Sequence, residues 1–214
     1  MTRFKTKDSP EVLHELPMEI IPLELMQGGG NRDLDLLESK GILFLEDDIS
    51  KQSISHTLKK LITLHSDPEF KDTIQIIINS PGGYCDAGWA LIDTLGYVKN
   101  RVKTIAMGQI CSMALSIFIA GDERWMTPNC SAMIHQFLGG GIGNYSDLIA
   151  KTKGWDLEMK RQVQHLIKCS NYKSEAQVKK NLLKDYDHYL SPEEMKKHGL
   201  CDVIFKPHVR GTRK

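Results

Sequence analysis

The stretch "TIQIIINSPGG", from Thr73 to Gly83, decides the fold. Its β-branched residues predict a strand from Thr73 to Ser80, and the apolar run is too continuous for a strand with one exposed face. We therefore predict a strand that is covered on both faces, as in a parallel sheet. Pro81, Gly82 and Gly83 end the strand in a tight turn.

The same unit, a strand followed by a helix, recurs on both sides of this stretch. Further strands are predicted at residues 41–47, 101–108 and 131–136, and a short one at residues 200–205. Helices are predicted at residues 53–66, 84–98 and 112–120, where apolar residues recur at helical spacing. This alternation predicts an α/β fold that is built of right-handed crossovers.

The two ends of the chain differ from this alternating region. Residues 1–33 contain prolines and a glycine triplet, which favour an arm or loop over a packed element. A long polar helix is predicted from Tyr145 to Cys169. Two short helices follow, with Ser174 and Ser191 as their N-caps, and both have the pattern of a capping box.

Composition indicates one soluble globular domain. The 214 residues are 41% hydrophobic, which suffices for one core, and no run approaches the roughly 18 apolar residues of a membrane span. The 28 basic and 27 acidic residues nearly cancel, so no overall attraction to nucleic acid or to a membrane surface is expected. The five cysteines form no CxxC pair, and their odd number predicts a reducing, cytoplasmic location.

Three candidate groups follow successive strands and would therefore meet at one edge of the sheet. Ser112 stands between a strand and its helix, where the amide of Met113 lies in the first helical turn. Gly83 belongs to the turn after the preceding strand, and His135 ends the following strand. A serine, a histidine that takes its proton and two amides that bind an oxyanion are the parts of an acyl-transfer site.

The residues alone leave a structural explanation open. A serine before an apolar helix is commonly an N-cap, and a histidine at a strand end is commonly a hydrogen-bonded structural residue. Cys111 lies next to Ser112 and is expected to point toward the core instead of acting as a nucleophile. We expect neither a metal ion nor a cofactor.

The motifs "INSPGG", "MGQICSM" and "MIHQFLGG", in that order, resemble the ClpP family, the proteolytic subunit of the ATP-dependent Clp protease. The resemblance covers the chain from about Leu16 to Phe205. It implies a ClpP/crotonase-like spiral of β-α-β units. Four regions follow from it: an axial arm (residues 1–33), an α/β head (34–138 and 172–206), a protruding handle of strand and helix (139–171) and a basic tail (207–214).

The resemblance also implies a role for each site residue. Ser112 matches the nucleophile, His135 the general base and Asp187 the orienting acid, although spacing alone does not separate Asp187 from Asp185, which remains the alternative. The amides of Gly83 and Met113 match the oxyanion hole. The substrate-binding strand corresponds to Phe137, Leu138, Gly139 and Gly140.

The family implies two stacked heptameric rings that enclose the catalytic serines. An AAA+ unfoldase of the ClpX, ClpA or ClpC type uses ATP to feed unfolded polypeptides into this chamber. The predicted function is thus that of a serine endopeptidase. The alternatives are a non-catalytic structural subunit of a mixed ring and a crotonase-type acyl-CoA enzyme, which gives no role to Ser112 and His135.

Among the departures from the pattern of the family, two lie within the motifs that carry the site. Ala114 stands where the family usually has a glycine, and Phe137 stands where it usually has a proline. The methyl group of Ala114 is expected to narrow the site slightly. Phe137 restores a backbone N–H and adds an aromatic ring beside the substrate, so we expect an altered cleavage preference.

Overall fold

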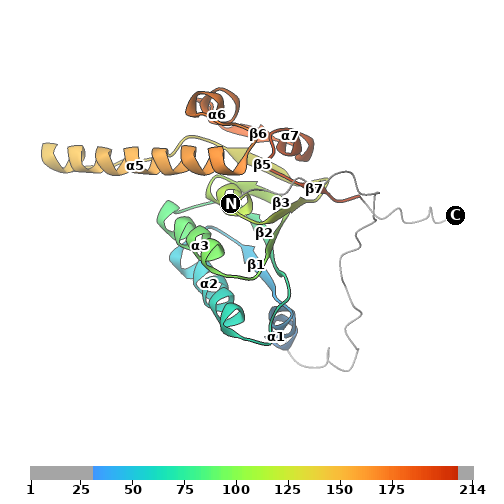
Figure 1. Cartoon of the computed structure of the whole chain (residues 1–214). Coiled ribbons are helices and arrows are strands. Elements are labelled where there is room, and N and C mark those ends of the chain that lie inside the picture. The colour runs from blue at the N-terminus through green and yellow to red at the C-terminus, as the bar shows by residue number, and fades with distance from the viewer. Residues whose placement is uncertain (1–30, 207–214) are drawn as a thin grey trace.

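A sheet of seven strands forms the centre of this computed structural model, which describes residues 31–206 (Figure 1). Strands β1, β2, β3, β4 and β7 are neighbours in that order and pair in parallel. Strand β5 pairs in parallel with β3 and antiparallel with β6. The strands span Ile42–Glu46 (β1), Ile74–Ser80 (β2), Val102–Cys111 (β3), Glu123–Met126 (β4), Ser131–Ile134 (β5), His188–Leu190 (β6) and Val203–Ile204 (β7).

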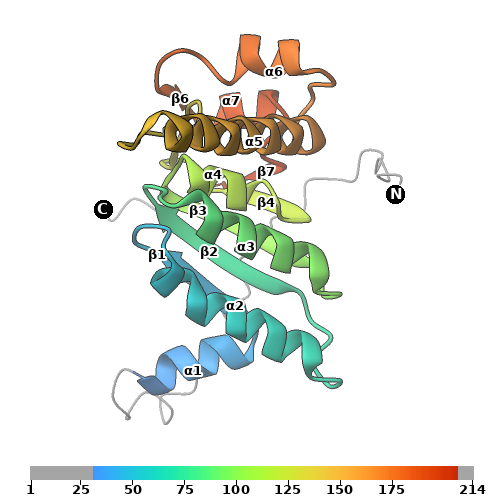
Figure 2. The same cartoon turned by 90° about the vertical axis from the view of Figure 1, so that its left-hand side faces the viewer.

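Helices α2, α3 and α4 form a row in front of the sheet, and α5 continues this row (Figure 2). The helices span Asn31–Ser39 (α1), Lys51–Ser66 (α2), Cys85–Tyr97 (α3), Met113–Phe118 (α4), Tyr145–Cys169 (α5), Glu175–Asn181 (α6) and Pro192–Lys197 (α7). Each helix predicted from periodicity is therefore present, with ends that shift by at most two residues. None of the helices within residues 31–206 combines the length and the apolar character that crossing a membrane requires.

Serine caps begin several of these helices. In α7, Ser191 accepts a hydrogen bond from the amide of Glu194, whose side chain accepts one from the amide of Ser191, so the predicted capping box is confirmed. In α6, Ser174 is the N-cap as predicted. The side chain of Gln177, however, accepts a hydrogen bond from the amide of Lys173 and not, as a capping box requires, from the amide of Ser174. The second capping box is therefore incomplete.

The prediction that β2 is covered on both faces is wrong for the single chain. Ile74, Ile76 and Ile78 are fully buried, whereas Gln75 and Ile77 on the opposite face are partly exposed. The row of helices covers only one face of the sheet (Figure 2). A continuous apolar run therefore does not show whether the second face of a strand is fully or only partly buried.

Three elements were not predicted. Strands β4 and β6 lie in segments for which the sequence predicts no element, and α1 begins at Asn31, inside the segment predicted as an arm. Residues 1–30 of that arm and the basic tail at residues 207–214 lie outside the described residues. The mostly parallel sheet with its helices confirms the predicted α/β class.

Helix α5 protrudes from the head, as Figure 1 shows. It has 25 residues, and its buried positions are Val163, Leu166 and Cys169, all in its last third. Residues 140–154, before and within its first half, are exposed throughout. The C-terminal part of α5 therefore anchors the helix on the head.

Candidate active site

Ser112 connects β3 to α4 through an unusual backbone conformation. Its φ is 53° and its ψ is −118°, a region that residues other than glycine rarely occupy and that typically costs about 1–3 kcal/mol. Its amide donates to the carbonyl oxygen of Met133 at 2.8 Å, which extends the pairing of β3 with β5 by one residue. Its side chain makes no capping hydrogen bond to α4. The hydroxyl is therefore available for a reaction.

The turn after β2 packs directly against this connection. Gly82 has a φ of 98°, and a Cβ atom there would lie 2.5 Å from the carbonyl oxygen of Cys111 and 2.9 Å from Cβ of Ser112. Gly83 has a φ of 150°, and a Cβ atom there would lie 2.3 Å from the carbonyl oxygen of Ile49. Only glycines allow the turn to come this close.

The amides proposed for the oxyanion hole lie in this region. Gly83 and Met113 both line the pocket that contains Ser112. Neither amide donates a hydrogen bond within the part of the chain that the structure describes. Two N–H groups beside a serine hydroxyl are suited to bind a developing oxyanion.

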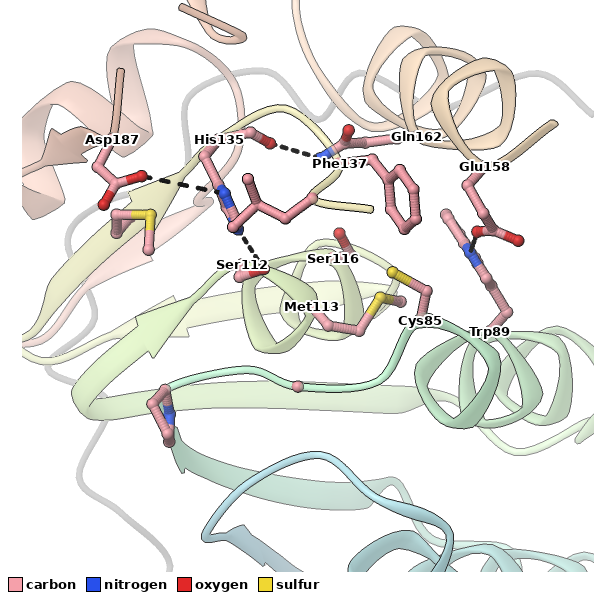
Figure 3. A pocket seen from close by; sticks show the side chains of 14 residues that line it. Cys85, Trp89, Ser112, Met113, Ser116, His135, Phe137, Glu158, Gln162 and Asp187 are labelled. Atoms are coloured by element: carbon pink, nitrogen blue, oxygen red, sulfur yellow. Dashed lines mark hydrogen bonds and ion pairs between the residues drawn. The ribbon is translucent and has the colours of Figure 1, made fainter. Parts of the chain in front are cut away.

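His135 directly follows β5 and contacts the serine. Its Nε2 atom lies 2.6 Å from Oγ of Ser112, as Figure 3 shows. With Nδ1 protonated and Nε2 bare, the hydroxyl donates to Nε2, which is the direction of proton transfer that a general base requires. The imidazole is largely buried, with 15% of its side chain exposed.

Asp187 reaches the histidine from the position directly before β6. Strands β5 and β6 are antiparallel with Ile134 opposite His188, so the adjacent residues His135 and Asp187 also lie across from each other. Oδ1 of Asp187 is 3.9 Å from Nδ1 of His135, which is close enough for an ion pair but too far for a hydrogen bond. Asp187 lines the pocket and Asp185 does not.

A pocket of about 360 Å³ lies beside Ser112 and extends to α3 and α5 (Figure 3). Phe137 and Leu138 of the predicted substrate-binding segment line it, but Gly139 and Gly140 do not. The prediction of a strand here is wrong for the single chain, because residues 135–144 belong to no strand. A glycine-rich segment without a pairing partner among the described residues has no ladder of hydrogen bonds to hold it extended.

Sequence reasoning missed the far wall of this pocket. Cys85 and Trp89 lie one turn apart on α3, and Nε1 of Trp89 donates to Oε2 of Glu158 at 2.7 Å. Burial, with a smaller effect of the negative charge of Glu158, raises the pKa of the Cys85 thiol. The i, i+4 spacing of Cys85 and Trp89 indicates a shared helix face, but nothing in the sequence pairs it with α5.

Cys111 does not line the pocket and is buried, as predicted. Its burial raises the pKa of its thiol, which keeps it in the weakly nucleophilic protonated form. Ala114 is also fully buried in α4. Among residues 31–206, no group of three or more His, Cys, Asp or Glu side chains is placed to hold a metal ion.

A comparison with known protein families adds an independent finding. The sequence model of one family, described as Clp protease, matches residues 30–208, which include every residue of the site above.

Proposed function

Because the chain belongs to the Clp protease family, we propose that it is a serine endopeptidase that cleaves unfolded polypeptides to short peptides. The family is one of peptidases, and the observation that supports a catalytic member is the 2.6 Å separation of Ser112 Oγ and His135 Nε2. A serine that only capped α4 would direct its hydroxyl to the helix amides. Ser112 makes no such bond.

In the proposed mechanism, Ser112 attacks the carbonyl carbon of the scissile peptide bond while its proton passes to Nε2 of His135. The amides of Gly83 and Met113 donate to the oxygen that becomes negative. His135 then gives the proton to the leaving amine, and a water molecule hydrolyses the acyl-enzyme in the reverse sense. Asp187 orients the imidazole and stabilises its positive charge.

The proposed assembly is a pair of stacked heptameric rings, with α5 as the handle between them. Its support is the exposure of the first half of α5, which carries the apolar residues Tyr145, Leu148, Ile149 and Leu157. Such residues on a protruding helix favour contact with another subunit. An AAA+ unfoldase of the ClpX, ClpA or ClpC type would deliver the substrate and use the ATP, while the subunit itself needs no cofactor.

One observation favours a second candidate function, that of a structural subunit in a mixed ring. The Asp187 side chain is 59% exposed and does not hydrogen-bond to His135. If this separation persists in the assembly, the imidazole loses its orienting partner. The protein would then form rings without cleaving peptides.

A fluorophosphonate probe separates the two candidates, because it reacts only with an activated serine. The expected result is labelling of the wild type and of Ser116→Ala, and none of Ser112→Ala. Ser116 is a matched control, since it lines the same pocket but, within residues 31–206, contacts a histidine through its carbonyl oxygen and not through its hydroxyl. Rings that are seen by native mass spectrometry but remain unlabelled and cleave no fluorogenic peptide would favour the structural subunit.

A further inference from the structure

One face of α5 is polar where it meets the pocket. Glu158, Gln162 and His165 follow each other at i, i+4 and i+7, so they lie on the same side of the helix. Each side chain forms a hydrogen bond to a different element of the site. The bonds run from Trp89 Nε1 on α3 to Glu158 (2.7 Å), from Gln162 to the carbonyl oxygen of His135 (2.8 Å) and from His165 to the carbonyl oxygen of Ser116 on α4 (2.8 Å).

Gln162 is the member of this face that reaches the general base. Its Nε2 atom donates to the backbone carbonyl of His135, as Figure 3 shows. Its Oε1 atom is buried and has no hydrogen-bond partner within residues 31–206. Rotating the amide of Gln162 by 180° would place its Oε1 atom against the carbonyl oxygen of His135, and both atoms are acceptors. The bond to His135 therefore fixes the orientation of the amide. The side chain thus keeps this bond although it leaves an acceptor unsatisfied, which is unfavourable.

Apart from Gln162 and the serine itself, few of the described groups hold His135 in place. The pairing of β5 with β6 ends at Ile134, and residues 135–144 belong to no strand. The carboxylate of Asp187, at 3.9 Å, forms no hydrogen bond to the imidazole. The backbone of His135 therefore depends on α5 for its position more than a residue within a ladder would.

We propose that Gln162 is a positioning residue for the general base, so that the place of α5 on the head sets the distance between His135 and Ser112. The proposal rests on the proposed peptidase function. It makes the anchored end of the protruding helix part of the active site. A displacement of α5 would draw the carbonyl of His135 with it and separate the imidazole from the serine.

The test compares Gln162→Met with Gln164→Met. Methionine has about the length and helix propensity of glutamine but donates no hydrogen bond. Gln164 lies on the same helix and is exposed, so its replacement is the matched control. Gln162→Met should lower kcat and the rate of fluorophosphonate labelling roughly tenfold with KM unchanged, because the base is displaced while the pocket remains. Gln164→Met should match the wild type.

Gln162→Arg places a donor at the same position and should recover part of the lost rate, which general loosening of the helix would not allow. Labelling of Gln162→Met at the wild-type rate would overturn the proposal. A wild type that is not labelled would instead refute the peptidase function. In that case the crystal structure of Gln162→Met decides: a Ser112–His135 distance that stays at hydrogen-bond length contradicts the positioning role, and a longer one supports it.

Discussion

His135 and Asp187 face each other directly beyond the last pair of two antiparallel strands, yet Nδ1 and Oδ1 of their side chains remain 3.9 Å apart. A movement of about 1 Å would close this gap to a hydrogen bond. Asp187 directly precedes β6 and lies outside the ladder, so only its loop must shift. The Ser112–His135 contact is already formed, and in the proposed mechanism the carboxylate of Asp187 is the group that still has to approach.

Replacing Asp187 by asparagine should reduce kcat/KM by about 10²–10⁴, because the imidazole loses the partner that selects its reactive tautomer. Asp185→Asn is the control, since Asp185 does not line the pocket. It should keep nearly full activity on a fluorogenic peptide. The reverse ranking of the two variants would assign the acid to Asp185.

Gly82→Ala should destabilise the fold by about 1–3 kcal/mol, as urea unfolding measures, and abolish probe labelling. The new Cβ would meet the carbonyl of Cys111 at 2.5 Å and push the turn away from Ser112. Gly96→Ala in α3 is the control, because nothing lies within 4 Å of its Cβ position. It should stabilise the helix by about 0.5–1 kcal/mol. Equal effects of the two changes would contradict the close packing of the turn.

His165 makes stability depend on pH. Burial lowers its pKa, the charge of Lys168 adds to this effect, and the hydrogen bond to the carbonyl of Ser116 opposes it. The folded state thus favours the neutral ring. Stability is full above the unfolded-state pKa of about 6.5 and declines as the pH falls from there through the folded-state pKa. His165→Leu should show a smaller decline between neutral pH and about pH 5 in urea unfolding; an unchanged decline would show that other groups cause it.

Arg124 fixes the last strand and the end of α5 to the head. Its side chain is 5% exposed, and the guanidinium donates to both carboxylate oxygens of Asp202 and to the carbonyl oxygens of Cys169 and Gly199. Arg124→Met should lower the free energy of unfolding, measured in urea, by about 3 kcal/mol, since it leaves buried acceptors without their hydrogen-bond donor. Arg101→Met removes an exposed ion pair with Glu123 and should cost at most about 1 kcal/mol. A similar small loss for Arg124→Met would contradict its role as a clamp.

The long elements of the fold were predictable because periodicity is a property of the sequence itself. Helices α2, α3 and α5 and strand β2 appear close to their predicted positions. Strand β6 has three residues and β4 has four, and segments this short contain too few repeats for periodicity alone to predict them. They are strands because of their neighbours, which local sequence does not identify.

The candidate site, too, could be predicted only in part from the sequence. The convergence of Ser112, Gly83 and His135 follows from the rule that parallel strands present their carboxyl ends at one edge. The partnership of His135 with Asp187 depends on β6 and on the register of Ile134 opposite His188, so the residues alone left Asp185 open. The polar contacts of α5 were also missed, since they join positions that lie far apart in the chain.

The order of the site along the chain has a consequence for synthesis. Ser112 and His135 lie in the middle of the chain, but Asp187 precedes a strand near its end. During translation the N-terminal residues are synthesised first. β5 stays without its antiparallel neighbour until residues 188–190 have left the ribosome. For the proposed peptidase, Ser112 and His135 would therefore be synthesised before the residue that orients the base, and the complete site would form only once residues 188–190 can pair with β5.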